Sequence, residues 1–189
     1  MFSGEDWYAR ELSGLSFTRC SFLDTDWTEV VDSASVFDHC TFANVQFNAS
    51  RHTAAAFLNC TFRGCTFFDV RFADCKMVGS GFRRAAFTLF AATGGDWSYT
   101  VLTGADLREA TFDGVRMREA DLTGARLEKA TVTGVDLSGA QLGGVRFNGA
   151  DLRGSDLSAL DPLAAELRGA TISLEQAAVI ASTLGMTVA

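Results

Sequence analysis

The chain places a bulky apolar residue at every fifth position and keeps that spacing without a shift for almost its whole length. From Phe2 to Ile172 there are 35 such positions in the 189-residue sequence, and 31 of them are bulky and apolar. The four exceptions are Asp32, His52, Ala92 and Pro162. A second column, of mostly small residues such as Cys60 and Ala120, lies two positions before the bulky one. A repeat this regular constrains the fold more than any other feature, because every unit must take a similar local structure.

A period of five residues fits neither an α-helix nor a straight strand. In a helix, successive five-residue steps rotate by about 140°, which would scatter the bulky side chains around the axis. In a strand every odd step reverses the side chain, so alternate bulky residues would point to solvent. The pattern is satisfied if the chain turns after every five residues and points one large and one small side chain inward. We therefore predict an all-β solenoid in which each coil covers the apolar surface of the next.

The exceptions suggest how many sides each coil has. Asp32, His52 and Ala92 are separated by multiples of 20 residues, so they would share one side of a coil with four five-residue sides. At ~4.8 Å per stacked strand, the rod would be on the order of 40 Å long. We expect Asp32 and His52 to lie within hydrogen-bonding reach and to mark a bulge where both meet water, rather than a catalytic pair. At Ala92 the bulky column has a small residue, but two positions earlier the small column has a large one, Phe90. This exchange would keep the core volume constant.

Near the C-terminus the pattern changes to that of a short helix. Ser173 followed three residues later by Gln176 is typical of a capping box, and Gly185 suits the end of the helix. We assign residues 1–172 to the solenoid and residues 173–189 to a capping α-helix with a short tail, whose last four residues would add a strand. The helix is apolar on more than one side, so we expect it to cover the end of the rod and to form a two-fold dimer contact; capping alone is the alternative. The predicted dimer residues are Leu174, Ala177, Ala178, Ile180, Ala181 and Leu184.

No group of residues in the sequence points to catalysis, a metal or a cofactor. All five cysteines fall in the small inward column and none forms a Cys-x-x-Cys pair, so we expect thiols used for packing. They are Cys20, Cys40, Cys60, Cys65 and Cys75. The repeat places no serine or cysteine nucleophile and no phosphate-binding loop beside Asp32 and His52. We therefore predict a protein that is not an enzyme and that holds no cofactor and no metal.

Charge varies along the chain. The net charge is −7, which argues against direct nucleic acid binding because that requires a basic footprint. Residues 1–38 carry eight acidic and two basic side chains, residues 39–94 carry two and six, and residues 95–189 carry thirteen and eight. Acidic ends thus flank a basic middle. The sequence shows no apolar run long enough to cross a membrane and no secretory signal at its start, so we expect a cytoplasmic protein without a membrane partner.

The unit Ala-Asp-Leu-x-Gly, as in Ala120–Gly124 and Ala150–Gly154, and its tandem array over residues 2–172 resemble the pentapeptide-repeat family. The resemblance implies a right-handed quadrilateral parallel β-helix. A narrower likeness is to the fluoroquinolone-resistance branch, the MfpA-type and Qnr-type proteins, and rests on total size, the segment Phe87–Trp97 and the segment after Ile172. The lack of long inserted loops places the chain nearer the MfpA type. The resemblance implies dimers joined through a C-terminal helix that protect DNA gyrase and mimic DNA in shape and charge.

The resemblance and the acidic rod together lead to a functional hypothesis. We expect a homodimer that binds DNA gyrase, or topoisomerase IV, and protects it from fluoroquinolones or a natural-product poison. Duplex DNA carries one charge per ~1.7 Å, or roughly two dozen over 40 Å, so a rod with a net charge of −7 must rely on acids at particular places. The candidate gyrase-binding residues are Asp106, Glu109, Asp121, Asp136, Asp151, Asp156, Asp161 and Glu166. A non-catalytic adaptor rod that binds an unrelated protein is the alternative.

Overall fold

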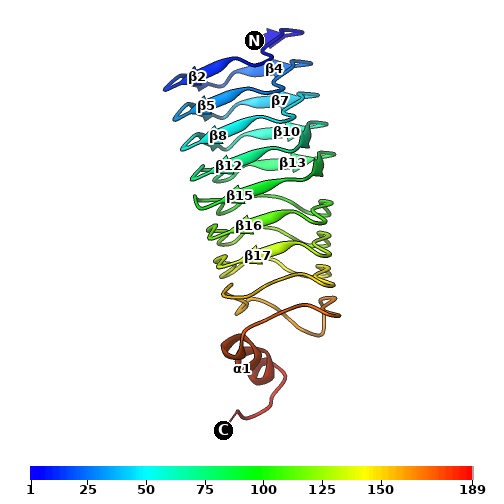
Figure 1. Ribbon diagram of the computed structural model, residues 1–189. Coiled ribbons are helices and arrows are strands. Elements are labelled where there is room, and N and C mark those ends of the chain that lie inside the picture. The colour runs from blue at the N-terminus through cyan, green and yellow to red at the C-terminus, as the bar shows by residue number, and fades with distance from the viewer. Residues whose placement is uncertain (189) are drawn as a thin grey trace.

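The protein is an elongated, four-sided rod with a helix at its C-terminal end (Figure 1). The computed structural model describes residues 1–188. Each coil stacks directly on the next with parallel pairing, and the paired residues are 20 apart in sequence, as Phe2 with Phe22 and Asp32 with His52. The prediction of an all-β solenoid with a four-sided coil is therefore confirmed.

We name the four sides after one inward residue of each: the Phe22, Trp27, Asp32 and Phe37 sides. The Phe22 side holds strands β1 (Phe2–Ser3), β4 (Ser21–Leu23), β7 (Thr41–Ala43), β10 (Thr61–Arg63) and β13 (Gly81–Arg83). The Trp27 side holds β11 (Thr66–Phe68) and β14 (Ala86–Thr88). The Asp32 side holds β2 (Glu11–Ser13), β5 (Val31–Ser33), β8 (Arg51–Thr53), β12 (Arg71–Ala73), β15 (Ala91–Thr93), β16 (Thr111–Asp113) and β17 (Thr131–Thr133). The Phe37 side holds β3 (Ser16–Thr18), β6 (Val36–Asp38) and β9 (Ala56–Leu58). Beyond these strands, isolated β-bridges on all four sides continue the stacking, as far as Thr171 on the Asp32 side.

Tight turns form many of the corners. In one of them the N–H of Ala105 donates to the carbonyl of Leu102 at 3.0 Å, and the third residue of the turn, Gly104, has a φ of +64°. A positive φ at the third residue is typical of a type II turn and favours glycine, which explains the glycines two positions after the bulky residue. At Gly95 no side chain fits at all, because a Cβ there would lie 2.1 Å from the carbonyl oxygen of Cys75 in the coil above.

The core consists of side-chain columns that run along the rod. Phe22 stacks on Phe42 with ring centroids 4.8 Å apart and planes 5° apart, and Phe42 stacks on Phe62 at 4.9 Å and 7°. The space left by Ala92 is filled by Phe90, which is 2% exposed. This exchange of volume between the two inward columns is confirmed, as dense packing of the interior requires.

The expectation that Asp32 and His52 reach water is wrong. Neither side chain is exposed, and His52 Nδ1 lies 3.3 Å from Asp32 Oδ2. The second ring nitrogen, Nε2, lies 3.1 Å from Ser50 Oγ. The imidazole also stacks on Phe72, with centroids 4.9 Å apart. No bulge forms, because a flat imidazole ring can take the place of a phenyl ring in the column and its two nitrogens find buried partners.

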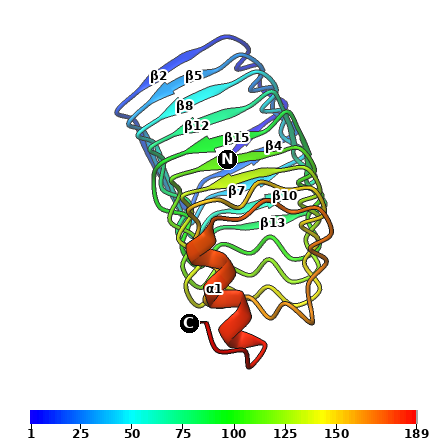
Figure 2. The same cartoon turned by 60° about the horizontal axis from the view of Figure 1, so that its bottom comes forward.

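Helix α1 (Leu174–Thr183) lies across the C-terminal end of the rod (Figure 2). The predicted capping box is confirmed, since the side chains of Ser173 and Gln176 each bond the other's backbone N–H. The side-chain amide of Gln176 also donates to the carbonyls of Leu152 and Ser155, at 2.6 and 2.7 Å. Gln176 therefore starts the helix and also satisfies buried carbonyl groups of the last complete coil.

The helix ends in a Schellman motif. Gly185 has a φ of +81°, its N–H donates to Ser182, and the N–H of Met186 donates to Ala181. The strand expected from residue 186 onward is absent among the described residues, since 186–188 have no regular secondary structure and Ala189 lies outside them. Helix α1 already lies over the end of the rod where such a strand would have to pair.

Replacing His52 by phenylalanine tests whether the contact between His52 and Asp32 stabilises the rod. His52→Phe keeps a stacked ring but leaves the Asp32 carboxyl group buried without its partner, so we expect a loss of about 3–5 kcal/mol of unfolding free energy. The double variant Asp32→Leu/His52→Phe restores an apolar column and should be close to the wild type. Urea denaturation of the wild type, both single variants and the double variant measures the coupling. Additive losses would contradict a direct pair.

Candidate interaction surface

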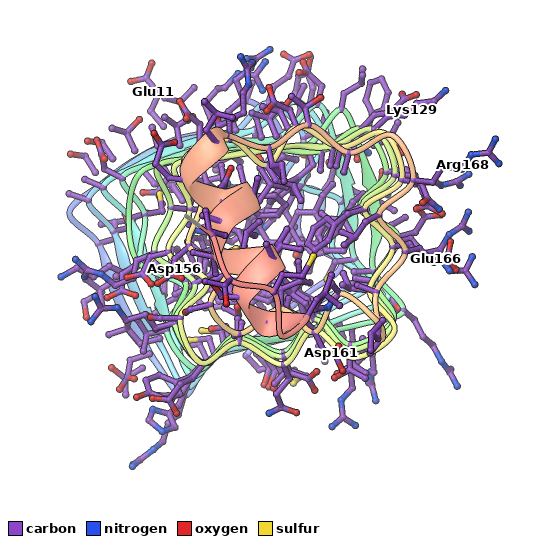
Figure 3. All side chains as sticks on the ribbon, turned by 90° about the horizontal axis from the view of Figure 1, so that it is seen from below. Glu11, Lys129, Asp156, Asp161, Glu166 and Arg168 are labelled. Carbon is purple, nitrogen blue, oxygen red and sulfur yellow. The ribbon has the colours of Figure 1, made fainter. Side chains whose placement is uncertain are left out.

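The eight acidic residues predicted to contact gyrase do not form one surface. Figure 3 shows Asp156, Asp161 and Glu166 projecting from three different sides of the rod. Their spacing of five residues moves each one to the next side of the coil. Asp136 and Asp156, by contrast, are 20 residues apart and are direct partners on the Phe37 side. The remaining members divide among the sides in the same way: Asp106 and Glu109 on the Trp27 side and its corner, Asp121 on the Phe22 side, and Asp151 on the Asp32 side.

The aspartates of this set have a structural role that the sequence analysis missed. A carboxylate oxygen of Asp156 accepts a hydrogen bond from the N–H of Ser158 at 2.8 Å, and Asp161 accepts one from Leu163 at 2.9 Å. The same bond to the N–H two residues later is made by Asp106, Asp121, Asp136 and Asp151. This is an Asx turn, which holds the backbone of the corner. Its sequence signal was the recurrence of aspartate directly before the bulky residue.

Four of the eight acids are also paired with arginine. The N···O distances are 2.8 Å for Asp106–Arg108, 2.5 Å for Asp136–Arg118, 2.6 Å for Asp151–Arg153 and 3.4 Å for Glu166–Arg146. Hydrogen bonds from Arg108 and Arg153 hold the pKa of Asp106 and Asp151 below the usual value. Asp106 and Asp151 are therefore ionised at neutral pH. The positive charge beside each of the four paired acids weakens the electric field that a partner would meet.

Three unpaired acids lie on two adjoining sides. Asp121, Asp156 and Asp161 form no ion pair among residues 1–188. Asp156 and Asp161 flank one corner near the C-terminal end (Figure 3), and Asp121 lies on the same Phe22 side as Asp161. We call these three residues the acidic corner. Glu109 is likewise unpaired within the described residues, but it lies away from them at the Trp27 side.

The outer face of α1 is apolar and exposed. Leu174 is 87% exposed, and Ala177 and Leu184 also face outward. Of the other residues predicted for the dimer contact, Ala178 and Ala181 are half-buried and Ile180 packs against the core of its own rod. Three further apolar residues that the sequence analysis did not select are exposed: Val179 on another side of α1, and Met186 and Val188 beyond its end.

The interior brings together a serine, a histidine and an aspartate, although no nucleophile was expected beside the pair. Ser50, His52 and Asp32 are each at most 1% exposed, so no substrate can reach Ser50 Oγ and the series acts as core packing. Within residues 1–188, no three His, Cys, Asp or Glu side chains are placed to hold a metal ion. Across the same residues, no helix is long and apolar enough to span a bilayer.

The cysteines are free thiols. Cys40, Cys60, Cys65 and Cys75 are buried, and Cys20 is half-buried near the N-terminal end. Burial raises the pKa of Cys60 and Cys75 to about 12 and that of Cys65 to about 11. Because the thiolate is the reactive form, these side chains are inert at neutral pH and act as packing groups.

Comparison with known proteins places this geometry among solved folds. A family model described as the pentapeptide repeat region matches residues 65–142. A trypsin-treated variant of QnrB1, described as a plasmid-mediated fluoroquinolone resistance protein, matches with a TM-score of 0.89 and 21% identity, covering 100% of this chain and 97% of that chain. A second trypsin-treated QnrB1 variant matches with a TM-score of 0.72 and 20% identity, covering 95% and 100%. A search of curated protein sequences finds no match. These similarities confirm the predicted fold class.

The raised thiol pKa values predict that the rod loses stability in alkali. An unburied thiol titrates near 9.0, whereas Cys60 and Cys75 keep their protons to about pH 12 in the folded rod. Their contribution to stability is therefore complete below about pH 9 and falls as the pH rises toward 12, because the unfolded chain then binds fewer protons. Urea denaturation at stepped pH should show a shallower alkaline fall for Cys60→Ala/Cys75→Ala than for the wild type. Equal slopes would contradict the burial of these thiols.

Proposed function

We propose that this chain, a pentapeptide-repeat protein, binds DNA gyrase or the related topoisomerase IV in the cytoplasm and reduces the action of inhibitors such as fluoroquinolones. The observation that carries the proposal is the match over the whole chain, at a TM-score of 0.89, to a protein described as conferring fluoroquinolone resistance. At 21% identity that match transfers shape rather than contacts. The contact residues must therefore be argued from this chain's own surface.

A stacked rod suits a site made for duplex DNA. Such a site is basic because it neutralises phosphates, and a rod with a net charge of −7 is attracted to it. The rod is also held rigid by continuous stacking, so little conformational freedom is lost on binding. The charge density of DNA is not reached, since half of the candidate acids are balanced by arginine. Mimicry would therefore rest on the shape of the rod and on the acidic corner.

Dimerisation through α1 would fit the same proposal. The exposed apolar face of α1 is the kind of surface that soluble proteins usually cover with a partner. A two-fold contact there would join two rods end to end and place both acidic corners near the centre of the longer rod. The unpaired acids of the two copies would then act on one enzyme.

The adaptor alternative also has an observation in its favour. Arginine partners beside Asp106, Asp136, Asp151 and Glu166 reduce the acidity of the rod, and reduced acidity is not what DNA mimicry requires. A rod that binds an unrelated protein would need no such acidity.

Gyrase assays with the purified protein decide between these functions. We expect the protein to lower fluoroquinolone-induced DNA cleavage by gyrase and to change supercoiling at micromolar concentration. Asp121→Asn/Asp156→Asn/Asp161→Asn should require roughly tenfold more protein for the same effect, since it removes charges from the proposed contact. Asparagine can still accept the Asx-turn hydrogen bond, so the corners should fold.

The matched control is Asp106→Asn/Asp136→Asn/Asp151→Asn, which changes the net charge equally but removes acids already paired with arginine. It should act like the wild type. Equal loss in both triple variants would show that overall charge, not the acidic corner, governs binding. No effect of the wild-type protein on cleavage or supercoiling would contradict the gyrase proposal and favour an adaptor.

Dimerisation is tested on the outer face of α1. Leu174→Asp/Val179→Asp places charge on exposed apolar positions of α1, and we expect it to halve the mass measured by light scattering while the rod stays folded, as circular dichroism would show. Ile180→Asp is the contrasting variant, because Ile180 packs against its own core and the change should lower the Tm. A full dimer mass for Leu174→Asp/Val179→Asp would place the dimer contact elsewhere.

A further inference from the structure

Three arginines form a positive patch on the Phe22 side, in the middle of the rod. Arg63 and Arg83 are direct partners in the pairing of β10 with β13, so their backbones lie only ~4.8 Å apart. Arg84 follows at the corner, and all three residues are exposed. We call Arg63, Arg83 and Arg84 the arginine patch.

The charge of the arginine patch is not balanced within the rod. Among the described residues, none of the three guanidinium groups makes a hydrogen bond or an ion pair. Eight other arginines do pair with carboxylates: Arg51, Arg71, Arg108, Arg116, Arg118, Arg126, Arg146 and Arg153. From Thr41 to Gly104 the Phe22 side carries no charged residue other than the arginine patch. The rod thus supplies partners for most of its guanidinium groups but leaves this cluster open.

The fold does not require arginine at these places. Like charges directly opposite each other on neighbouring strands destabilise a sheet. The equivalent positions of the coils on either side hold Ala43, which is buried, and Thr103, which is exposed, so a small or neutral residue fits the same backbone. The residues before the two arginines on the same strands, Thr61 and Gly81, are small, and the arginine side chains are exposed. Two other arginine pairs lie in direct register, Arg51 with Arg71 and Arg126 with Arg146, but carboxylates balance their charges. The pair of Arg63 and Arg83 has no such partner, which indicates a role in binding.

The chemistry and size of the patch favour an acidic protein segment over nucleic acid. Guanidinium groups bind both carboxylate and phosphate groups in a bidentate manner. A duplex, however, carries a charge every ~1.7 Å and needs an extended basic footprint. The arginine patch spans only two neighbouring coils. Residues 1–38 on one side carry eight acidic and two basic side chains, a net charge of −6. Residues 95–189 on the other side carry thirteen acidic and eight basic side chains, a net charge of −5. Those flanks would repel a long polyanion but would leave a compact group of carboxylates free to bind.

We infer that the arginine patch is a docking site for an acidic protein segment that presents two or three neighbouring Asp or Glu carboxylates. The carboxylates would take the place that Asp and Glu of this chain occupy beside its other arginines. This site is separate from the acidic corner and has the opposite charge, so the inference does not depend on gyrase being the partner.

Binding of a labelled hexaglutamate peptide, followed by fluorescence anisotropy at low ionic strength, tests the inference. We expect saturable binding that weakens by about tenfold in Arg63→Gln/Arg83→Gln and falls with added salt. The matched control, Arg19→Gln/Arg168→Gln, removes the same charge from two exposed arginines outside the patch and should bind like the wild type. Thermal unfolding provides a second measurement: removing one like-charged pair should raise the Tm of the free Arg63→Gln/Arg83→Gln variant by about 1–3 °C.

The remaining outcomes would overturn the inference. Absence of saturable peptide binding, or equal weakening in the control variant, would show that the patch is not a specific site. Tighter binding of a short DNA duplex through the same arginines would make the partner a nucleic acid. A lower Tm for Arg63→Gln/Arg83→Gln would show that the arginines stabilise the rod itself.

Discussion

Each coil of the rod lies over the next with paired residues 20 apart, and backbone hydrogen bonds such as that from Val31 N–H to Arg10 C=O, at 3.0 Å, hold this register. A shift of one residue would turn the bulky column out of the core, so the register and the apolar packing enforce each other. The same stacking places like side chains on like, as in the column of Phe22, Phe42 and Phe62. It also allows His52 to replace a phenylalanine, because a flat ring stacks equally well and Asp32 lies directly above it.

The register governs the surface as strictly as the core. Residues 20 apart become neighbours, so Asp136 lies beside Asp156 and Arg63 beside Arg83. Residues five apart point to different sides, which is why acids that are close in sequence are separated in space. Every outward position therefore has a fixed neighbour above and below, and its charge is either balanced there or left for a partner. This is how one repeat produces a surface on which some charges are balanced by a neighbouring coil and others are not.

Three such places have different chemistry. The acidic corner is open to a basic surface, the arginine patch to carboxylates, and the outer face of α1 to another apolar surface. They lie at different positions along one rigid rod, so partners could bind at the same time without competing. The buried polar groups belong to another class: Ser50, His52 and Asp32 are enclosed by the same stacking that orders them, and the thiols of Cys60 and Cys75 are kept protonated by burial.

The architecture follows from the sequence pattern, because a five-residue period without a shift is compatible only with a chain that turns at every unit. The spacing of Asp32, His52 and Ala92 suggested a four-sided coil, which the pairing of residues 20 apart confirms, and the capping box at Ser173 indicated the helix that follows it. The tertiary structure alone decided which surface groups remain free. Side-chain directions and neighbours from other coils are not contained in a one-dimensional pattern. They decide, for example, that Asp106 pairs with Arg108, that Leu174 is exposed and that Ile180 packs against the core. For the same reason the sequence indicated that Asp32 and His52 meet but not that they are buried, since burial depends on how neighbouring columns close around them.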